Sequence, residues 1–151
     1  MASFSASEGM LARVAAAPTG LIEGIPLFSS LDRRELRAVA ESLKDRAFAA
    51  GKTIVEEGTS GIGFFVIESG TAKVAVGGNE LRTLGPGDHF GEIALITDSP
   101  RTATITADTD VSCYGMTVWE FRAIVESNAS IAWKLLQSLA QRLTEAELRA
   151  R

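Results

Sequence analysis

Hydrophobic positions recur with a helical period near the start of the chain, from about residue 25 onward. Asp32 and Glu35 have the spacing of a capping box, which predicts the start of a helix. The apolar positions behind them recur three and four residues apart on one helix face: Leu36, Val39, Ala40 and Leu43. We therefore expect an N-terminal helical segment over residues 25–44, preceded by an appendage over residues 1–24 with a short helix at 10–17.

The period changes between residues 45 and 117, where short runs rich in β-branched and aromatic residues alternate with glycine turns. The predicted strands are residues 52–56, 63–68, 71–76, 80–84, 103–107 and 111–116. Gly77, Gly78 and Asn79 tolerate positive φ and predict a hairpin between two of these strands. Many short strands at regular spacing are typical of an antiparallel sandwich or jelly roll, so the predicted fold class is α+β, mainly β.

Beyond Met116 the chain contains neither glycine nor proline, and the helical period returns. One helix is predicted over residues 118–126 and a longer one over 129–149, with a break at Ser127 and Asn128. The longer helix carries an apolar stripe made of Ile131, Leu135, Leu136, Leu139, Ala140 and Leu143. Such a stripe needs a partner surface, which is either the domain's own sheet or a second subunit in a homodimer.

The composition removes several classes of chemistry. The 151 residues include 15 Lys and Arg, 19 Asp and Glu, one histidine and one cysteine, which gives a net charge of −4. These counts exclude a disulfide within the chain and a Cys/His zinc site, so we expect no metal or cofactor. The acidic balance argues against nucleic-acid binding. Because no apolar run reaches membrane-spanning length and the start does not resemble a signal peptide, we expect a soluble, cytoplasmic protein.

Residues 90–104 interrupt the strand pattern with a segment suited to an anionic ligand. Gly91 lets the backbone approach a ligand closely, and the short helix predicted after it leaves N–H groups unpaired, which favours an anion. Arg101 follows Pro100 and has the planar fork that binds phosphate through two hydrogen bonds. Glu92 lies in an apolar run and would need donors such as sugar hydroxyls. The segment therefore predicts a ligand with a phosphate close to a sugar hydroxyl.

This segment resembles the phosphate-binding cassette of cyclic nucleotide-binding domains, the family of the bacterial catabolite activator, kinase regulatory subunits and cyclic-nucleotide-gated channels. The residues that carry the resemblance are Gly91, Glu92, Ala94, Leu95, Pro100, Arg101, Ala103 and Thr104. The similarity extends over about residues 26–143. It implies a jelly roll over residues 45–117, followed by hinge and lid helices over residues 118–151.

The resemblance also implies a role for each matched position. Glu92 would accept a hydrogen bond from the ribose 2′-hydroxyl, and Gly91 would give the ligand room. Ile93 and Ala94 would donate backbone N–H groups to the phosphate, and Arg101 would pair with its exocyclic oxygens. The chain has the matching residue at each of these positions.

Three further positions concern the base. Thr102 would face the phosphate and the base edge, Val74 would form part of the base-side wall, and Arg142 corresponds to a side chain that some channel-type members place over the purine. A threonine at this position is compatible with guanine and is also tolerated by adenine binders. The predicted ligand is therefore cAMP or cGMP, and we favour cAMP. His89 has no nucleophile or carboxylate partner assigned by a motif, so we expect it to be structural or solvent-facing.

The sequence therefore predicts a sensor of cAMP or cGMP that is not an enzyme. In this reading the ligand moves the C-terminal helices about a hinge near Ser127 and Asn128, and an unidentified downstream protein or domain receives the signal. The alternative is a structural or protein-interaction domain of the same fold that binds no nucleotide.

Overall fold

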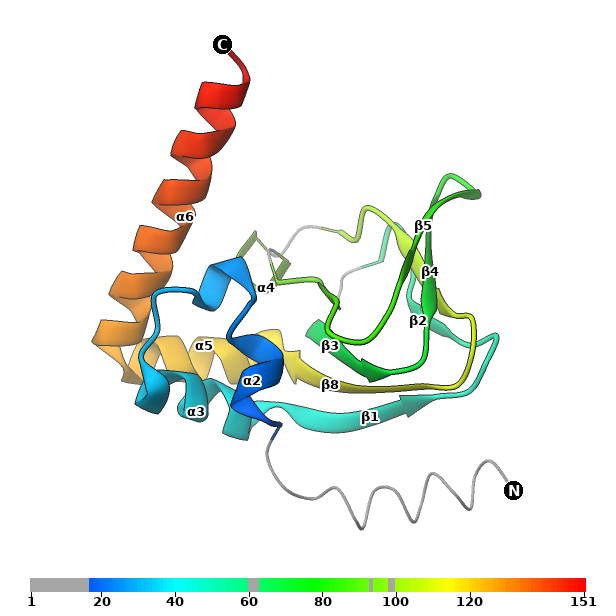
Figure 1. Cartoon of the computed structure of the whole chain (residues 1–151), viewed down its shortest axis with the longest axis horizontal. Coiled ribbons are helices and arrows are strands. Elements are labelled where there is room, and N and C mark those ends of the chain that lie inside the picture. The colour runs from blue at the N-terminus through cyan, green and yellow to red at the C-terminus, as the bar shows by residue number, and fades with distance from the viewer. Residues whose placement is uncertain (1–16, 60–62, 93, 98–99) are drawn as a thin grey trace.

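Two four-stranded antiparallel sheets form the centre of the protein in the computed structural model, which describes residues 17–59, 63–92, 94–97 and 100–151. The strands are β1 (Lys44–Phe48), β2 (Thr53–Val55), β3 (Gly63–Ser69), β4 (Ala72–Val76), β5 (Asn79–Leu84), β6 (His89–Phe90), β7 (Thr104–Ala107) and β8 (Val111–Thr117). One sheet has the order β1-β8-β3-β6 and the other the order β2-β7-β4-β5. This arrangement confirms the predicted fold class (Figure 1).

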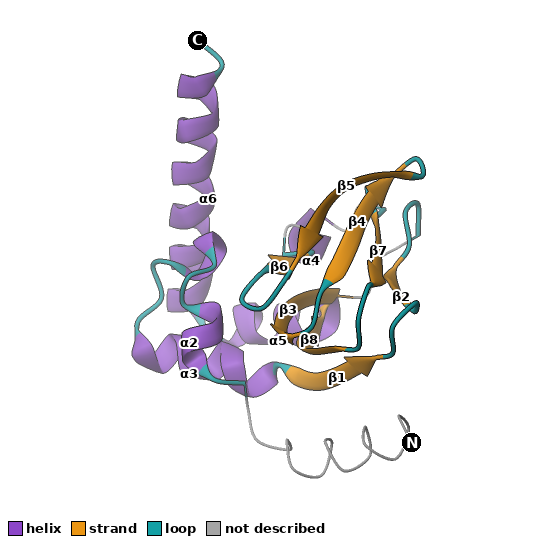
Figure 2. Ribbon diagram, turned by 45° about the vertical axis from the view of Figure 1, so that its right-hand side comes forward, coloured by secondary structure: helices purple, strands orange, loops and turns teal. Residues whose placement is uncertain are grey.

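The helices gather on one side of the sheets (Figure 2). They are α2 (Thr19–Ile22), the 3₁₀ helix η1 (Pro26–Phe28), α3 (Arg33–Ser42), α4 (Ala94–Thr97), α5 (Val118–Ser127) and α6 (Ala129–Arg149). The capping box at the start of α3 is present, because the Asp32 side chain accepts from the Glu35 N–H and Glu35 accepts from the Asp32 N–H. Both groups satisfy N–H donors that a helix start otherwise leaves without a partner.

Strand β3 separates two apolar clusters. Alternate side chains of a strand point to opposite faces, so Phe64 packs with the helices while Phe65 and Ile67 face the second sheet. Because β3 is buried on both faces, its sequence is a continuous apolar run rather than an alternating one. The protein therefore has two apolar clusters, one between the helices and the sheet β1-β8-β3-β6 and one inside the sandwich.

Two strands were not predicted from the sequence. Strand β1 lies at an edge and has the polar sequence Lys-Asp-Arg-Ala-Phe, so it shows little alternation. Strand β6 has two residues and pairs only with β3. The helix predicted over residues 10–17 lies outside the described residues except for Ala17, which is buried, and α2 follows it and buries Ile22.

The apolar stripe of α6 divides into two halves. Ile131 and Leu135 are buried against the body, whereas Leu136 and Leu143 are more than half exposed. The second half of α6 extends away from the sandwich toward the C-terminus (Figure 1). Within the part of the chain that the structure describes, no helix combines the length and the apolar character needed to span a bilayer.

Candidate functional site

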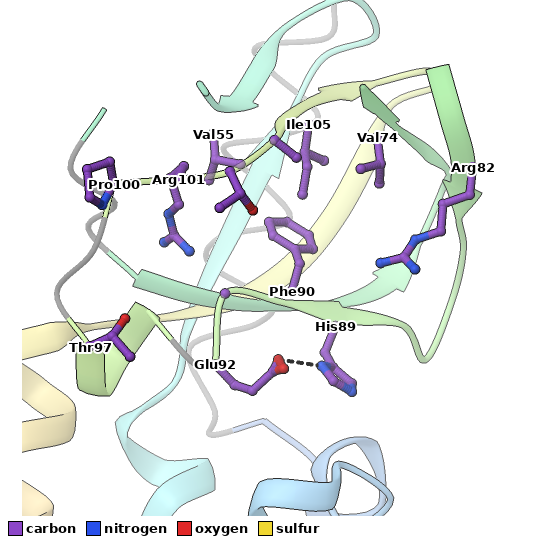
Figure 3. A pocket seen from close by; sticks show the side chains of 13 residues that line it. Val55, Val74, Arg82, His89, Phe90, Glu92, Thr97, Pro100, Arg101 and Ile105 are labelled. Carbon is purple, nitrogen blue, oxygen red and sulfur yellow. Dashed lines mark hydrogen bonds and ion pairs between the residues drawn. The ribbon is translucent and has the colours of Figure 1, made fainter. Parts of the chain in front are cut away.

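A cavity of about 510 Å³ lies where β6 leads into α4, within the size range of small-ligand sites. Its walls come from both sheets and from the segment between α4 and β7 (Figure 3). The lining residues are Val55, Val74, Arg82, His89, Phe90, Gly91, Glu92, Thr97, Pro100, Arg101, Thr102, Ala103 and Ile105. The cavity therefore combines an apolar wall with charged groups of both signs.

Gly91 allows the chain to pass beside Arg101. Its φ of +91° lies in the left-handed region, which side chains disfavour. A Cβ atom at Gly91 would lie 2.5 Å from Nη1 of Arg101 and 2.7 Å from the carbonyl oxygen of Gly63. Any other residue at position 91 would displace the guanidinium from its place in the cavity.

Arg101 is a buried cation at the edge of the cavity, with 8% of its surface exposed. Its backbone is fixed, since its N–H donates to the Thr59 carbonyl and its carbonyl accepts from Gly58. The guanidinium donates from Nη2 to the Gly63 carbonyl, while the buried Nε–H has no hydrogen-bond partner among the described residues. Burial lowers the pKa of Arg101. The negative charge of the nearby Glu92 acts in the opposite direction but does not outweigh the burial.

A buried guanidinium with an unpaired donor costs free energy unless an anion completes it. Among the described residues, no carboxylate lies within ion-pair distance of Arg101. The arrangement therefore suits an anionic ligand whose oxygens approach Arg101 from the cavity.

Glu92 binds His89 at the other end of the cavity. The His89 Nδ1 lies 2.8 Å from the Glu92 Oε2, and the two side chains are 25% and 13% exposed. Burial raises the pKa of Glu92, but the hydrogen bond and charge of His89, with a smaller effect of Arg142, outweigh it and leave the pKa lowered. Glu92 is thus an ionised acceptor in a partly desolvated place.

Figure 3 shows Glu92 and His89 on one side of β6 and Phe90, Ile105 and Val74 on the other. The apolar side chains belong to the cluster inside the sandwich. Both groups belong to the cavity lining, which includes Phe90 and Ile105 as well as His89 and Glu92. A ligand there meets an apolar wall on one side and the carboxylate on the other.

The structure brings most of the predicted site residues together. Gly91, Glu92, Arg101, Thr102 and Val74 all line the cavity. The prediction for Ile93 falls outside the described residues, and Ala94 is the first residue of α4. Arg142 lies on α6 and is not among the described residues that line the cavity, although its charge acts on Glu92.

Two ionisable lining residues were not among the site residues predicted from the sequence. His89 was expected to be structural or solvent-facing, but it lines the cavity and binds Glu92. Arg82 on β5 is the register partner of Val74 on β4, and Figure 3 shows its guanidinium pointing into the cavity. Cross-strand partners share a face, so Arg82 and Val74 line the same cavity.

The family model described as "Cyclic nucleotide-binding domain" matches residues 45–128. The chain belongs to this family. Over 101 residues it is 40% identical to a cAMP-dependent protein kinase regulatory subunit of Debaryomyces hansenii, which covers 66% of this chain and 22% of the relative. A cGMP-dependent protein kinase of Toxoplasma gondii is 38% identical over 92 residues, covering 61% of this chain and 9% of the relative.

A solved structure supports the same assignment at the level of the fold. The N-terminal domain of a transcriptional regulator from Streptomyces coelicolor superposes with a TM-score of 0.78 at 28% identity, covering 83% of this chain and 94% of that one. The chain spans about a fifth of the length of the kinase regulatory subunits it matches. Cyclic nucleotide-binding domains are regulatory, and these relatives are regulatory subunits.

Proposed function

We propose that the chain is a sensor that binds cAMP, with cGMP as the alternative base, and that it acts without enzymatic activity, metal or cofactor. The observation that carries the proposal is Arg101, a buried cation with an unpaired Nε–H at a cavity of small-ligand size. One cyclic phosphate supplies the single negative charge and the exocyclic oxygens that such a group requires.

The other site residues complete this pose. Glu92 accepts a hydrogen bond from the ribose 2′-hydroxyl, while the N–H groups of Ile93 and Ala94 bind the phosphate. Val74 packs against the base, and Thr102 faces the phosphate and base edge. The lowered pKa of Glu92 supports its part, since an ionised carboxylate is the stronger acceptor.

Calorimetric titration of Arg101→Ala with cAMP and cGMP tests the proposal. Loss of a charge-assisted contact should weaken binding by about ten- to a hundredfold. Arg122→Ala is the matched control, because Arg122 lies exposed on α5 and pairs only with Glu126 among the described residues. Parent-like affinity in Arg101→Ala contradicts the assignment, and a parent that neither binds nor is stabilised by either nucleotide favours a structural domain instead.

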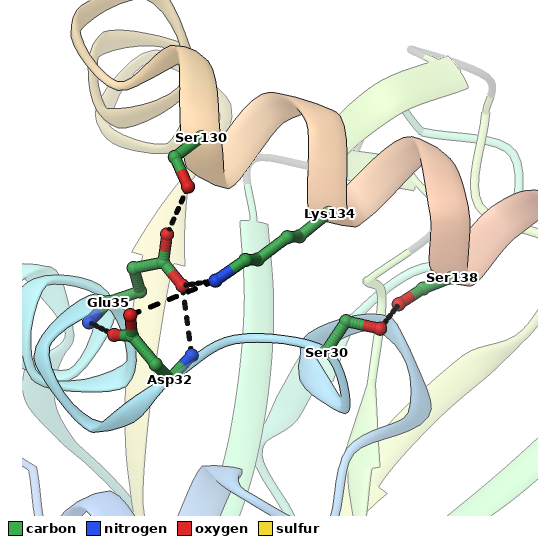
Figure 4. A network of polar contacts seen from close by, with 6 residues as sticks. All are labelled: Ser30, Asp32, Glu35, Ser130, Lys134 and Ser138. Carbon is green, nitrogen blue, oxygen red and sulfur yellow. Dashed lines mark hydrogen bonds and ion pairs between the residues drawn. The ribbon is translucent and has the colours of Figure 1, made fainter.

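We propose that ligand binding moves α6 about the break between α5 and α6. In this structure α6 is docked on the N-terminal helices through a polar network: Lys134 lies 2.6 Å from Glu35, Ser130 donates to Glu35, and Ser30 lies 3.3 Å from Ser138 (Figure 4). The proposed movement would break this network and release α6 to a second position.

The two tryptophans of the chain report this movement, since both lie exposed on the C-terminal helices. Trp119→Phe leaves Trp133 on α6 as the single fluorophore. A change in its emission on saturation with nucleotide supports the movement, and unchanged emission, with binding confirmed by calorimetry, contradicts it.

The receiver of the signal is proposed to be a protein partner or effector domain, in the cytoplasm, with no nucleic acid or membrane contacted directly. One exposed face of α6 presents Trp133, Leu136 and Leu143, each more than half exposed. We propose that this face forms the seam of a homodimer. Light scattering with and without nucleotide gives the molar mass, which distinguishes a monomer from a homodimer.

A further inference from the structure

We propose that His89 is a positioning residue that holds the carboxylate of Glu92 for the ligand and makes nucleotide affinity depend on pH. The inference rests on the proposed function, because it assigns a second residue to the ribose contact. It concerns a side chain that no catalytic or binding motif in the sequence singles out.

The geometry fixes Glu92 from one side only. The His89 Nδ1 holds Oε2 at 2.8 Å, which leaves Oε1 and the remaining lone pairs of the carboxylate as acceptors for a ligand hydroxyl. The imidazole is itself held, since its ring lies 6.3 Å from the ring of Phe64, which in turn contacts Phe28 edge to face. A carboxylate with a fixed orientation loses less conformational entropy when a ligand binds to it.

The charges around the pair come from several elements. Arg101, before β7, and Arg142, on α6, both act on Glu92, and Arg82 on β5 lines the same cavity. Arginine keeps its charge throughout the neutral range. His89 is the chain's single histidine, and histidine is the side chain that ordinarily changes charge between pH 5 and 8.

The direction of the pH dependence of nucleotide affinity follows from the charged and neutral forms of the imidazole. A charged ring makes a charge-assisted bond to Glu92. A neutral ring makes a weaker bond, and only in the tautomer that carries the proton on Nδ1. Affinity should therefore be higher with the charged ring than with the neutral ring, by about three- to tenfold, the scale of ordering one long side chain.

Two variants separate positioning from titration. His89→Asn places an amide near the position of Nδ1, so it still donates to Glu92 but cannot change charge. His89→Phe keeps the ring contact with Phe64 and removes the donor. We expect a flat pH profile for both variants, with His89→Asn closer to the parent at pH 8 and His89→Phe weaker than the parent by about three- to tenfold at pH 6.

The matched ligand is the 2′-deoxy cyclic nucleotide, which lacks the hydroxyl that Glu92 would accept from. Calorimetry with both ligands between pH 6 and 8, and a thermal scan of each variant, complete the experiment. If His89 acts through Glu92, the pH dependence disappears with the 2′-deoxy ligand.

A pH dependence that persists with the 2′-deoxy ligand overturns the positioning role and leaves only a long-range charge effect. A flat profile in the parent overturns the proposal as a whole. Neither result resembles failure of the proposed function, in which the parent binds no cyclic nucleotide at any pH. Arg122→Ala, which removes a charge far from the cavity lining, should reproduce the parent's profile.

Discussion

Replacement of Glu35 by glutamine should loosen the docking of α6 and lower the stability of the domain above pH 5. The Glu35 side chain is 10% exposed and lies 2.6 Å from Lys134. The hydrogen bond from Lys134, and next the N–H of Asp32, lower the pKa of Glu35 from 4.5 to about 2, although burial opposes this. Glutamine at the same position still caps α3, so Glu35→Gln isolates the charged contact between α3 and α6.

The magnitude follows from the pKa. At about 1.4 kcal/mol for each tenfold change in proton affinity, a lowering from 4.5 to about 2 corresponds to about 3 kcal/mol. The cap that glutamine keeps, and solvent around Lys134, reduce the loss to about 1–2 kcal/mol. For a domain of this size we expect the melting temperature at pH 7 to fall by about 3–6 °C.

The lowered pKa of Glu35 fixes how the stability difference between the parent and Glu35→Gln varies with pH. A carboxylate whose pKa is lowered on folding contributes its stability above its unfolded value and loses it as the pH falls toward its folded value. The difference between parent and Glu35→Gln should therefore be complete above pH 5 and should shrink between pH 4.5 and about 2. Urea unfolding at pH 7, 5 and 3 measures it, with Glu126→Gln, in an exposed pair on α5, as the control.

Two results would refute this reasoning. One is a Glu35→Gln variant as stable as the parent at pH 7, which means that the contact is screened by water. The other is a stability gap that stays constant from pH 5 to pH 3, which means that the loss comes from packing rather than from charge. The control should be about as stable as the parent at each pH, because an exposed helical pair contributes little.

Two further substitutions address the cavity. Gly91→Ala should weaken nucleotide binding in calorimetry by tenfold or more, because its Cβ would lie 2.5 Å from Nη1 of Arg101 at a φ of +91°; unchanged affinity would show that the guanidinium can move freely. Arg82→Ala should weaken cGMP more than cAMP in paired titrations, because guanine presents two acceptors, O6 and N7, to an arginine, whereas adenine pairs N7 with a donor. Equal losses would place Arg82 away from the base.

The helices and strands were predictable wherever a local sequence signal marks them, such as a cap or an apolar face. The capping box at Asp32 and Glu35 and the glycine-poor C-terminal helices are local signals, and the structure contains both. Strand β1 was missed because an edge strand with charged residues has no apolar face to reveal it. Local patterning thus predicts elements that bury one face and misses those held mainly by a neighbouring strand.

The cavity shows the same limit at the level of single residues. Counting back from the hairpin at Gly77 and Gly78 would place Leu81 opposite Val74. A register shift between Val74 and Ala75 instead brings Arg82 to that position and leaves Leu81 exposed. The bulge leaves no mark in the sequence, so the cation it turns toward the cavity could not be assigned from spacing.

In the proposed sensor, the position of β6 would let one turn act on both the ligand and α6. Glu92 contacts His89, whose ring lies beside Phe64, and Phe64 contacts Phe28 of η1, on which α6 packs. A ligand shifts α6 only by the difference in its affinity for the two helix positions. In the proposed sensor, the Glu35 network would favour the docked position of α6, whereas the His89 contact is the one that a ribose hydroxyl would alter. Variants of Glu35 should therefore change the response of Trp133 at every pH at which Glu35 is ionised.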